Sequence, residues 1–153
     1  MVNHGGTEMG QGLNTKVAQV VAHELGLPFD AVRCSATDTS KVANTSATAA
    51  STGSDLNGKA AQDAARKIKA RLAAFAAQRL GCAAELVTFE QGQVSGGGQS
   101  LTFKDLVAAA YLQRIQLWSD GFYATPGLHW DRAKLQGHPF YYFAWGGAVC
   151  EAL

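Results

Sequence analysis

The sequence predicts an α+β fold in which at least three helices pack on a mixed sheet. Apolar residues recur at helical spacing in three stretches, and shorter apolar runs between them suit strands. Glycine and proline punctuate these stretches, so the predicted elements have recognisable ends. A chain of 153 residues suits one domain, and we expect residues 1–153 to form a single domain.

Two of the helical stretches lie in the first half of the chain. The first covers residues 13–25 and ends at Gly26. The second begins at Ser54 or Asp55, either of which can cap a helix, and ends at Gly81. The inward face of this second helix is predicted to consist of Leu56, Ala60, Ala64, Ile68, Leu72 and Phe75.

A third helix and a group of aromatic residues are expected to complete the core. Thr102 can cap this helix, whose inward face is predicted to hold Phe103, Leu106, Val107 and Ala110. Aromatic residues near predicted strands are expected in the core, not stacked on a ligand: Phe122, Tyr123, Trp130, Phe140, Tyr141, Tyr142 and Phe143. His129 and His138 lie in the same region, where we expect structural roles for both.

Strands are predicted between and after the helices. Residues 31–36 form a short apolar run that suits a strand. Residues 87–89 and 91–95 suit a hairpin, with glycines 96–98 as its exit. Residues 141–149 are the best candidate for a closing strand.

Composition argues against two classes of partner. The formal net charge is +1 and only 16% of the residues are charged, so there is no electrostatic footprint for nucleic acid. The basic residues of the second predicted helix, Arg66, Lys67, Lys69 and Arg71, are expected to form a solvated face. No apolar run approaches the roughly 20 residues that span a membrane. No signal peptide precedes the first glycine-rich segment, so we expect a cytoplasmic protein.

The cysteines and histidines show no metal-binding pattern. Cys34, Cys82 and Cys150 form an odd, scattered set, which suits buried, reduced thiols in a cytosolic protein. The four histidines have no metal-ligand spacing with one another or with cysteine. A zinc or iron ion bound by protein side chains is therefore not expected.

A glycine-rich loop is the most informative local feature. Residues 5–12 read GGTEMGQG and lead directly into the first predicted helix. Such a loop can leave its backbone N–H groups bare and aim them, with the positive helix end, at an anionic group. A glycine turn that only caps the helix is an equally good interpretation of the pattern. Gln11 stands between two glycines, and its amide can both donate and accept hydrogen bonds.

A second polar stretch covers residues 37–54. It is rich in Ser, Thr, Asn and Ala and lacks periodicity, so at least its first half is expected to be a loop. Nearly every side chain in residues 44–54 is small, which would let the backbone approach a ligand closely. The residues alone favour a simpler interpretation, a Ser/Thr-rich loop that enters a helix.

Three blocks of the sequence resemble one protein family. They are residues 4–16 (HGGTEMGQGLNTK), 37–58 (TDTSKVANTSATAASTGSDLNG) and 121–132 (GFYATPGLHWDR). Each is similar to a segment of the molybdopterin-binding domain of xanthine dehydrogenases, in the molybdenum hydroxylase family, and the blocks follow that family's order. The resemblance implies that the chain is an internal piece of a larger molybdopterin-binding domain.

The resemblance also implies a set of site residues. Those expected to contact the cofactor are Met9, Gly10, Gln11, Thr48, Ala50 and Ser51. Ala49 and Ala50 resemble the small wall beside the metal and the aromatic substrate, so a bulky side chain at either position should close the pocket. Glu8 matches a residue that is not the catalytic base, and we expect it to complement the charge of the helix start.

The implied activity is that of an oxidoreductase that hydroxylates purines with water as the source of oxygen. Its cofactor would be molybdenum-molybdopterin, and electrons would pass through Fe-S clusters and FAD, on other domains or subunits, to NAD. The implied partners are the remainder of the molybdenum-binding subunit, the Fe-S/FAD subunit or domain, and the purine substrate.

No catalytic residue is expected within this chain. In the family the glutamate base belongs to a segment that should lie beyond Leu153, and the substrate-clamping residues to one that should lie before Met1. The chain alone is therefore expected to be inactive. The alternative is a non-catalytic molybdopterin-binding or assembly module.

Overall fold

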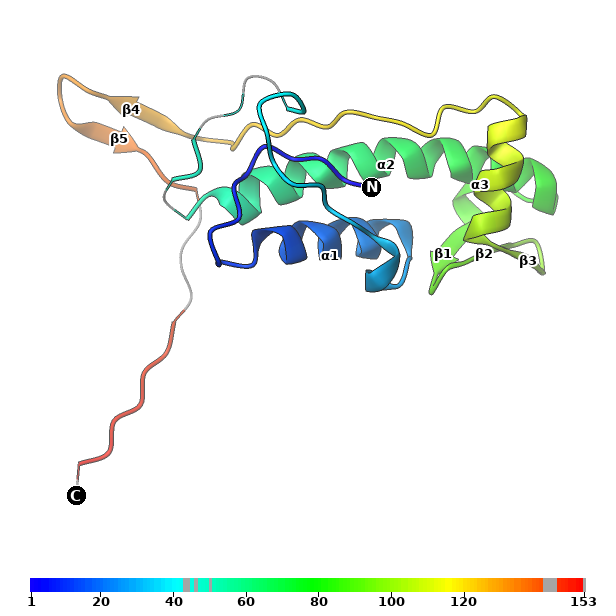
Figure 1. Cartoon of the computed structure of the whole chain (residues 1–153), viewed down its shortest axis with the longest axis horizontal. Helices are drawn as coiled ribbons and strands as arrows, with labels where there is room; N and C mark the ends of the chain where they lie inside the picture. Colours follow the sequence, from blue (N-terminus) through cyan, green and yellow to red (C-terminus); the bar gives the residue numbers. More distant parts are fainter. Residues whose placement is uncertain (43–44, 46, 50, 142–145, 153) are drawn as a thin grey trace. The chain divides into compact units, whose positions relative to one another are not determined.

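The computed structural model describes residues 1–42, 45, 47–49, 51–141 and 146–152. The chain divides into two compact units, Met1–Tyr123 and Ala124–Leu153 (Figure 1). The described residues contain three α-helices and small antiparallel sheets, which confirms the predicted α+β class. Their only parallel pairing is an isolated bridge between Val2 and Cys34. That residues 1–153 form a single domain stays a prediction.

Helix α1 (Leu13–Leu25) forms where it was predicted, because apolar residues at helical spacing give it a buried face. Gly26 ends it in the left-handed conformation, with φ of 64°, and donates its N–H to the last carbonyls of the helix. The sheet packs closely over this cap, since a Cβ on Gly26 would overlap the carbonyl oxygen of Phe89. Gly92 also donates its N–H to the Gly26 carbonyl, at 2.7 Å.

Helix α2 (Gly53–Leu80) begins slightly earlier than predicted. Its N-cap residue is Thr52, so the prediction that Ser54 or Asp55 caps the helix is wrong. The Thr52 side chain makes no capping hydrogen bond, and its hydroxyl donates instead to the carbonyl of Ala49. The predicted end at Gly81 is confirmed, again with φ of 64°.

The two halves of α2 pack into different hydrophobic clusters. The first half packs beside α1 (Figure 1), in a cluster of Leu13, Val17, Val21, Ala61 and Ala65. The second half packs on the sheet and on the third helix, in a cluster of Leu72, Phe75, Ala76, Leu80, Val94, Leu106 and Ala110. The predicted face is therefore correct at Leu72 and Phe75. It is wrong at Leu56, which is exposed, because the face that meets α1 is formed by neighbouring positions.

The sheet contains strands β1 (Thr88–Glu90), β2 (Gln93–Gly96) and β3 (Gln99–Thr102), antiparallel and in that order. The predicted hairpin exists, but glycines 96–98 turn the chain into β3 instead of leaving the sheet. The register pairs Val94 with both Phe89 and Leu101. These three apolar residues therefore share one face, which packs on the second core.

Helix α3 (Phe103–Leu112) confirms its predicted cap and inward face. The Thr102 hydroxyl oxygen accepts the N–H of Asp105, at 3.1 Å. The hydroxyl in turn donates to the Asp105 carboxylate, at 2.7 Å. Leu106 and Ala110 are fully buried, with Phe103 and Val107 packed against the same core.

An extended segment that follows α3 is tied along α2 by three side chains spaced one helical turn apart. Arg71 donates to the carbonyls of Gln116 and Trp118, each at 2.9 Å. Lys67 donates to the Asp120 carbonyl at 3.3 Å, and Asp63 accepts the N–H of Phe122 at 3.1 Å. Gly121 approaches so closely that a Cβ would overlap the Ala60 carbonyl oxygen.

The basic residues of α2 form a largely solvated face, as predicted, and they also hold parts of the first unit together. Arg66 forms an ion pair with Glu24 of α1 at 3.1 Å, and Lys69 approaches the same carboxylate at 3.9 Å. The Lys67 ammonium and the Phe122 N–H lower the pKa of the Asp63 carboxyl. Each group remains partly open to solvent, so screening keeps the energy of any single pair small.

Two strand predictions are not confirmed. Residues 31–36 form no ladder, because Phe29–Ala31 is a 3-10 turn and only Cys34 bridges to Val2. In the predicted closing strand, Tyr141 and residues 146–149 are not in a strand, and residues 142–145 lie outside the described residues.

The second unit contains a hairpin of β4 (His129–Asp131) and β5 (Gln136–His138). The predicted aromatic core is wrong at Phe122 of the first unit and at Trp130, Phe140 and Tyr141 of the second, because all four side chains are exposed. A two-stranded hairpin is a single layer, which by itself buries little apolar surface. Tyr142 and Phe143 lie outside the described residues. His129 and His138 are cross-strand partners whose rings stack with centroids 6.3 Å apart.

The three cysteines are free thiols, as predicted, but they are less buried than expected. Cys150 is exposed, whereas Cys34 and Cys82 are half-buried. Burial raises the pKa of the Cys34 thiol, which therefore favours its protonated, less reactive form.

The caps of α1 and α2 allow a matched test of packing. Both Gly26 and Gly81 have φ of 64°, but a Cβ on Gly81 would meet nothing within 4 Å. Gly81→Ala should therefore lower the free energy of unfolding by only about 1 kcal/mol, the cost of placing alanine in the left-handed conformation. Gly26→Ala should cost about 1–3 kcal/mol more, because the Phe89 backbone must move. Urea unfolding of both variants measures the difference, and equal losses would contradict the close approach.

Candidate cofactor-binding site

The base of the glycine loop is buried and tightly packed. His4 is only 7% exposed, and its Nδ1 accepts the N–H of Gly6 at 3.2 Å. Its Nε2 lies 2.9 Å from the Oδ1 of Asn14, in the first turn of α1. A Cβ on Gly6 would overlap the Leu13 side chain and lie 2.7 Å from the amide nitrogen of Asn57. The loop backbone is thus wedged between α1 and α2, and a larger residue at position 6 would displace the Leu13 and Asn57 side chains.

The tip of the loop is organised by one carboxylate. Glu8 accepts the backbone N–H groups of Gly10 and Gly12, each at 2.9 Å, and of Asn14 at 3.0 Å. These bonds, that from Asn14 most strongly, lower the pKa of the Glu8 carboxyl. The expected role of Glu8 at the helix start is confirmed. The expected bare N–H groups are not found here, because Glu8 supplies their acceptor from within the loop.

The Gln11 amide folds back on its own loop. Its Oε1 accepts the N–H of Met9 at 2.6 Å, and its Nε2 donates to the Thr7 carbonyl at 2.8 Å. The outer side of the loop is open beside it. Met9 is 69% exposed, and a Cβ on Gly10 would meet nothing within 4 Å. A ligand can therefore approach the backbone of Gly10 directly.

The second block joins the first at two successive residues. The Thr37 hydroxyl donates to the Gly6 carbonyl at 2.7 Å, and the Thr48 hydroxyl oxygen accepts the N–H of Thr7 at 2.8 Å. The Thr45 side chain packs so closely on Gly5 that a Cβ there would overlap it. Loops that are more than 30 residues apart in sequence therefore form one surface.

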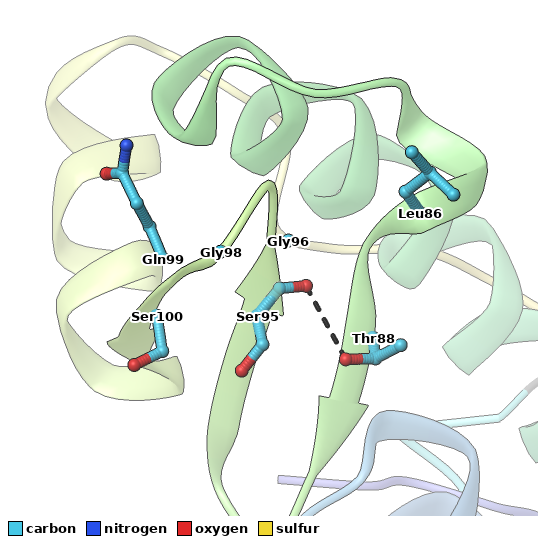
Figure 2. A pocket seen from close by; sticks show the side chains of 7 residues that line it. All are labelled: Leu86, Thr88, Ser95, Gly96, Gly98, Gln99 and Ser100. Atoms are coloured by element: carbon cyan, nitrogen blue, oxygen red, sulfur yellow. Dashed lines mark hydrogen bonds between the residues drawn. The ribbon is translucent and has the colours of Figure 1, made fainter.

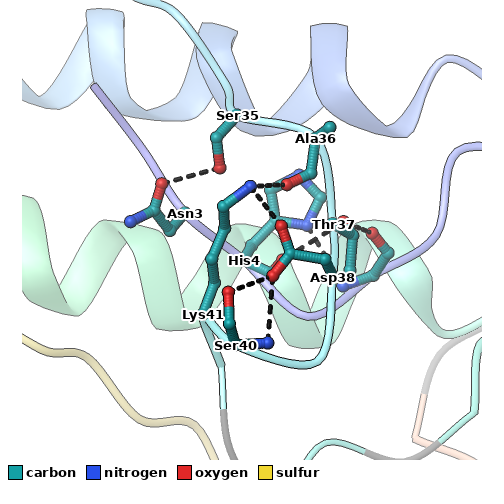
Figure 3. A network of polar contacts seen from close by, with 9 residues as sticks. Asn3, His4, Ser35, Ala36, Thr37, Asp38, Ser40 and Lys41 are labelled. Carbon is teal, nitrogen blue, oxygen red and sulfur yellow. Dashed lines mark hydrogen bonds and ion pairs between the residues drawn. The ribbon is translucent and has the colours of Figure 1, made fainter.

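A compact polar network holds the start of the second block (Figure 3). The Asp38 carboxylate accepts from the Lys41 ammonium at 2.6 Å and from both the N–H and the hydroxyl of Ser40. Lys41 also donates to the Ala36 carbonyl at 2.6 Å. Lys41 first, and then Ser40, lower the pKa of Asp38 to about 2. The turn that follows Thr37 is thereby closed by its own side chains.

The structure brings most of the predicted cofactor contacts together. Gln11 and Thr48 both bind the Thr7 backbone, and Gln11 also accepts the N–H of Met9. Gly10 lies between Met9 and Gln11 in the chain. Ala49 and Ser51 are exposed in the segment that leads from Thr48 into α2, and Ala50 lies outside the described residues. That these residues contact a cofactor stays a prediction.

Three structural contributors were missing from the predicted contacts: His4, Thr7 and Thr37. His4 and Thr37 are the first residues of two of the family-like blocks, and their membership of these blocks is the one sequence feature that could have identified them. The hydrogen bond from Thr37 to Gly6 joins residues 31 positions apart, which no sequence pattern specified, whereas His4 accepts the N–H of a residue only two positions along the chain.

A separate hollow of about 420 Å³ lies on the three-stranded sheet (Figure 2). It is lined by Leu86, Thr88, Ser95, Gly96, Gly98, Gln99 and Ser100. The Thr88 hydroxyl donates weakly across its floor to the Ser95 carbonyl, at 3.5 Å. The lining carries no charged group and none of the predicted contacts, so this hollow is not the candidate site.

The groups offered by the two loops suit an organic cofactor. They are an amide, hydroxyls and open backbone. Among the described residues, no three His, Cys, Asp or Glu side chains are grouped so that they could hold a metal ion. In the same part of the chain, no helix is long and apolar enough to cross a membrane.

This fold and site define a piece of a cofactor-binding α+β protein, built from two polar loops that meet beside the starts of two helices. The chain belongs to the molybdopterin cofactor-binding domain family, which it matches over residues 1–152.

Sequence relatives support the same assignment. The chain is 42% identical over 151 residues to xanthine dehydrogenase from Oryza sativa subsp. japonica and 38% identical over 151 residues to xanthine dehydrogenase/oxidase from Felis catus. Each match covers 99% of this chain and 10% of the relative. The resemblance to xanthine dehydrogenases is confirmed, and the chain spans about one tenth of the length of these curated relatives.

Solved structures agree with the fold. Quinoline 2-oxidoreductase from Pseudomonas putida 86 matches with a TM-score of 0.63 and 27% identity, over 73% of this chain and 14% of that one. Reconstituted CO dehydrogenase from Oligotropha carboxidovorans matches with a TM-score of 0.65 and 28% identity, over 78% and 15%.

The Glu8 contacts predict a pH-dependent loop. Because N–H donors favour the carboxylate, the pKa in the folded loop lies below that of an unfolded glutamate. The stabilisation is therefore complete above the unfolded pKa and lost as pH falls through the folded pKa. NMR titration of the Glu8 carboxyl, with amide exchange at Gly10 and Gly12, measures both effects.

Glu8→Gln is the control for this charge, because it keeps an acceptor oxygen. We expect faster amide exchange at Gly10 and Gly12 in this variant, without the acid-dependent change. A Glu8 pKa at or above that of an unfolded glutamate would contradict the carboxylate's role in ordering the loop.

Proposed function

We propose that this chain is part of the molybdenum cofactor-binding domain of an oxidoreductase that hydroxylates purines, of the xanthine dehydrogenase type. The observation that carries the proposal is the hydrogen bond between Thr7 and Thr48, which joins the two family-like loops into one surface around Gln11. The xanthine dehydrogenase relatives support purines as the substrate class. When bound, molybdenum-molybdopterin would supply the redox chemistry of the hydroxylation.

The residues present fit the uncharged, hydrogen-bonding edge of a pterin. Gln11 and Thr48 offer an amide and a hydroxyl, and the backbone at Gly10 is open to approach. The start of α1 is poorly suited to an anion, because the Glu8 carboxylate already takes the N–H groups of Gly12 and Asn14. The first loop would therefore meet the heterocycle in preference to a phosphate.

Each predicted residue has a place in this proposal. Gln11 and Thr48 would hydrogen-bond the cofactor, with Met9 and Gly10 in contact beside them. Ser51 would add a hydroxyl, and Ala49 and Ala50 would form the small wall next to the substrate. None of these side chains can act as a general base near neutral pH. The catalytic base would therefore come from another part of the protein, and this chain alone would not turn over.

The proposed partners follow from the share of the relatives that the chain covers. It spans about one tenth of their length, so the remainder of a molybdenum-binding subunit is the first partner. Fe-S and FAD groups on other domains or subunits would carry electrons away from a purine substrate to NAD. We propose a cytoplasmic location for the assembly. A non-catalytic molybdopterin-binding or assembly module fits less well, because the relatives are named as dehydrogenases.

Cofactor retention by the 153-residue chain tests the binding part of the proposal. The chain is dialysed to equilibrium against molybdopterin, and retained pterin is measured by fluorescence after oxidation. Gln11→Ala and Thr48→Val should each lower retention about tenfold, as for one lost hydrogen bond. Gln99→Ala and Thr88→Val are matched controls on the sheet and should change nothing. Equal retention by all five proteins would overturn the site.

Turnover provides the second test. The chain loaded with the cofactor should not oxidise xanthine with an artificial electron acceptor, because it lacks a base. Xanthine oxidation by the purified chain would contradict the absence of a catalytic residue.

A further inference from the structure

A buried imidazole at the base of the first loop has no place among the predicted cofactor contacts. We propose that His4, as the neutral imidazole protonated at Nε2, is a positioning residue that sets Gln11 for the pterin. The inference rests on the proposed function and assigns a role to a residue that does not itself touch the cofactor.

The hydrogen bonds determine the tautomer. A backbone N–H can only donate, so the Gly6 N–H requires an unprotonated Nδ1 on His4. In a neutral ring the proton is then on Nε2, which donates to the Oδ1 of Asn14 at 2.9 Å. His4 therefore connects the loop backbone to the first turn of α1 through its two nitrogens.

His4 is linked to Gln11 by hydrogen bonds to the backbone of Gly6 and Thr7. All four polar backbone groups of Gly6 and Thr7 are bound by side chains. His4 accepts from the Gly6 N–H and Thr37 donates to the Gly6 carbonyl. Thr48 accepts from the Thr7 N–H and Gln11 donates to the Thr7 carbonyl. A shift of Gly6 therefore moves the carbonyl that orients the Gln11 amide.

The surroundings of His4 leave little room for compensation. Gly6 is buried, and the space for a Cβ is filled by Leu13 and Asn57. If Nδ1 is lost, the Gly6 N–H is left without an acceptor in a site with little access for water. The loop would then have to rearrange, and Thr7 and Gln11 would move with it.

Two substitutions separate the two nitrogens of His4. His4→Asn places an amide oxygen near the position of Nδ1 and keeps an acceptor for Gly6. His4→Gln places an amide nitrogen near the position of Nε2 and keeps only the link to Asn14. His23→Gln makes the same chemical change on the exposed side of α1 and is the matched control.

The expected results differ between the variants. His4→Gln should lower molybdopterin retention in the dialysis assay about tenfold and speed Gly6 amide exchange by a similar factor. His4→Asn should retain most of both, and His23→Gln should match the unchanged chain. In the unchanged chain, NMR should show an unprotonated Nδ1 on His4 and a scalar coupling across the Gly6 N–H···Nδ1 bond.

The outcomes distinguish failure of this inference from failure of the proposed function. If the unchanged chain retains molybdopterin and His4→Gln retains as much, the inference is overturned and the function stands. Equal losses in both His4 variants, with equally lowered melting temperatures, would also overturn it, because His4 would then only fill space. If the unchanged chain and Gln11→Ala both retain nothing, the proposed function fails and the inference with it. A protonated Nδ1 overturns the inference without any variant.

Discussion

The packing of α2 against two different partners is the constraint on which the first unit depends. This helix of 28 residues buries its first half against α1 and its second half against the sheet and α3. Small residues, Ala61 and Ala65, face α1, whereas the larger Leu72 and Phe75 fill the core beneath the sheet. Because α2 begins directly after the second loop, the same packing also delivers Thr48 to the first loop.

In the candidate site, backbone N–H groups of the glycine-rich loop are bound by side chains of the same loop. A glycine-rich loop beside a helix start has many N–H groups and few side chains to accept them. Here Glu8 accepts three of them at the tip, and His4 accepts one at the base. This pairing changes the kind of ligand that the loop can bind. A loop that would otherwise attract an anion presents amide and hydroxyl groups at its surface, and these suit a neutral heterocycle.

Much of the local structure was predictable from the sequence. Gly26 and Gly81 end their helices because glycine adopts positive φ without a Cβ penalty, and Thr102 caps α3 through its hydroxyl. The start of α2 was missed because Thr52, Ser54 and Asp55 are all good caps, and local propensity does not choose among them. The family-like loops also located the candidate site, since their unusual glycine and small-residue content is a local property.

The sequence by itself determined where the helices lie, which family the chain belongs to and which loops carry the candidate contacts, because these depend on residues close together in the chain. Only the tertiary structure decided that Thr37 and Thr48 bind the Gly6–Thr7 backbone, and that Arg71 and Lys67 hold the segment after α3. These contacts join residues that are 31 to 53 positions apart. Periodicity and local propensity are properties of neighbouring residues, so they do not specify which distant backbone group a polar side chain will bind.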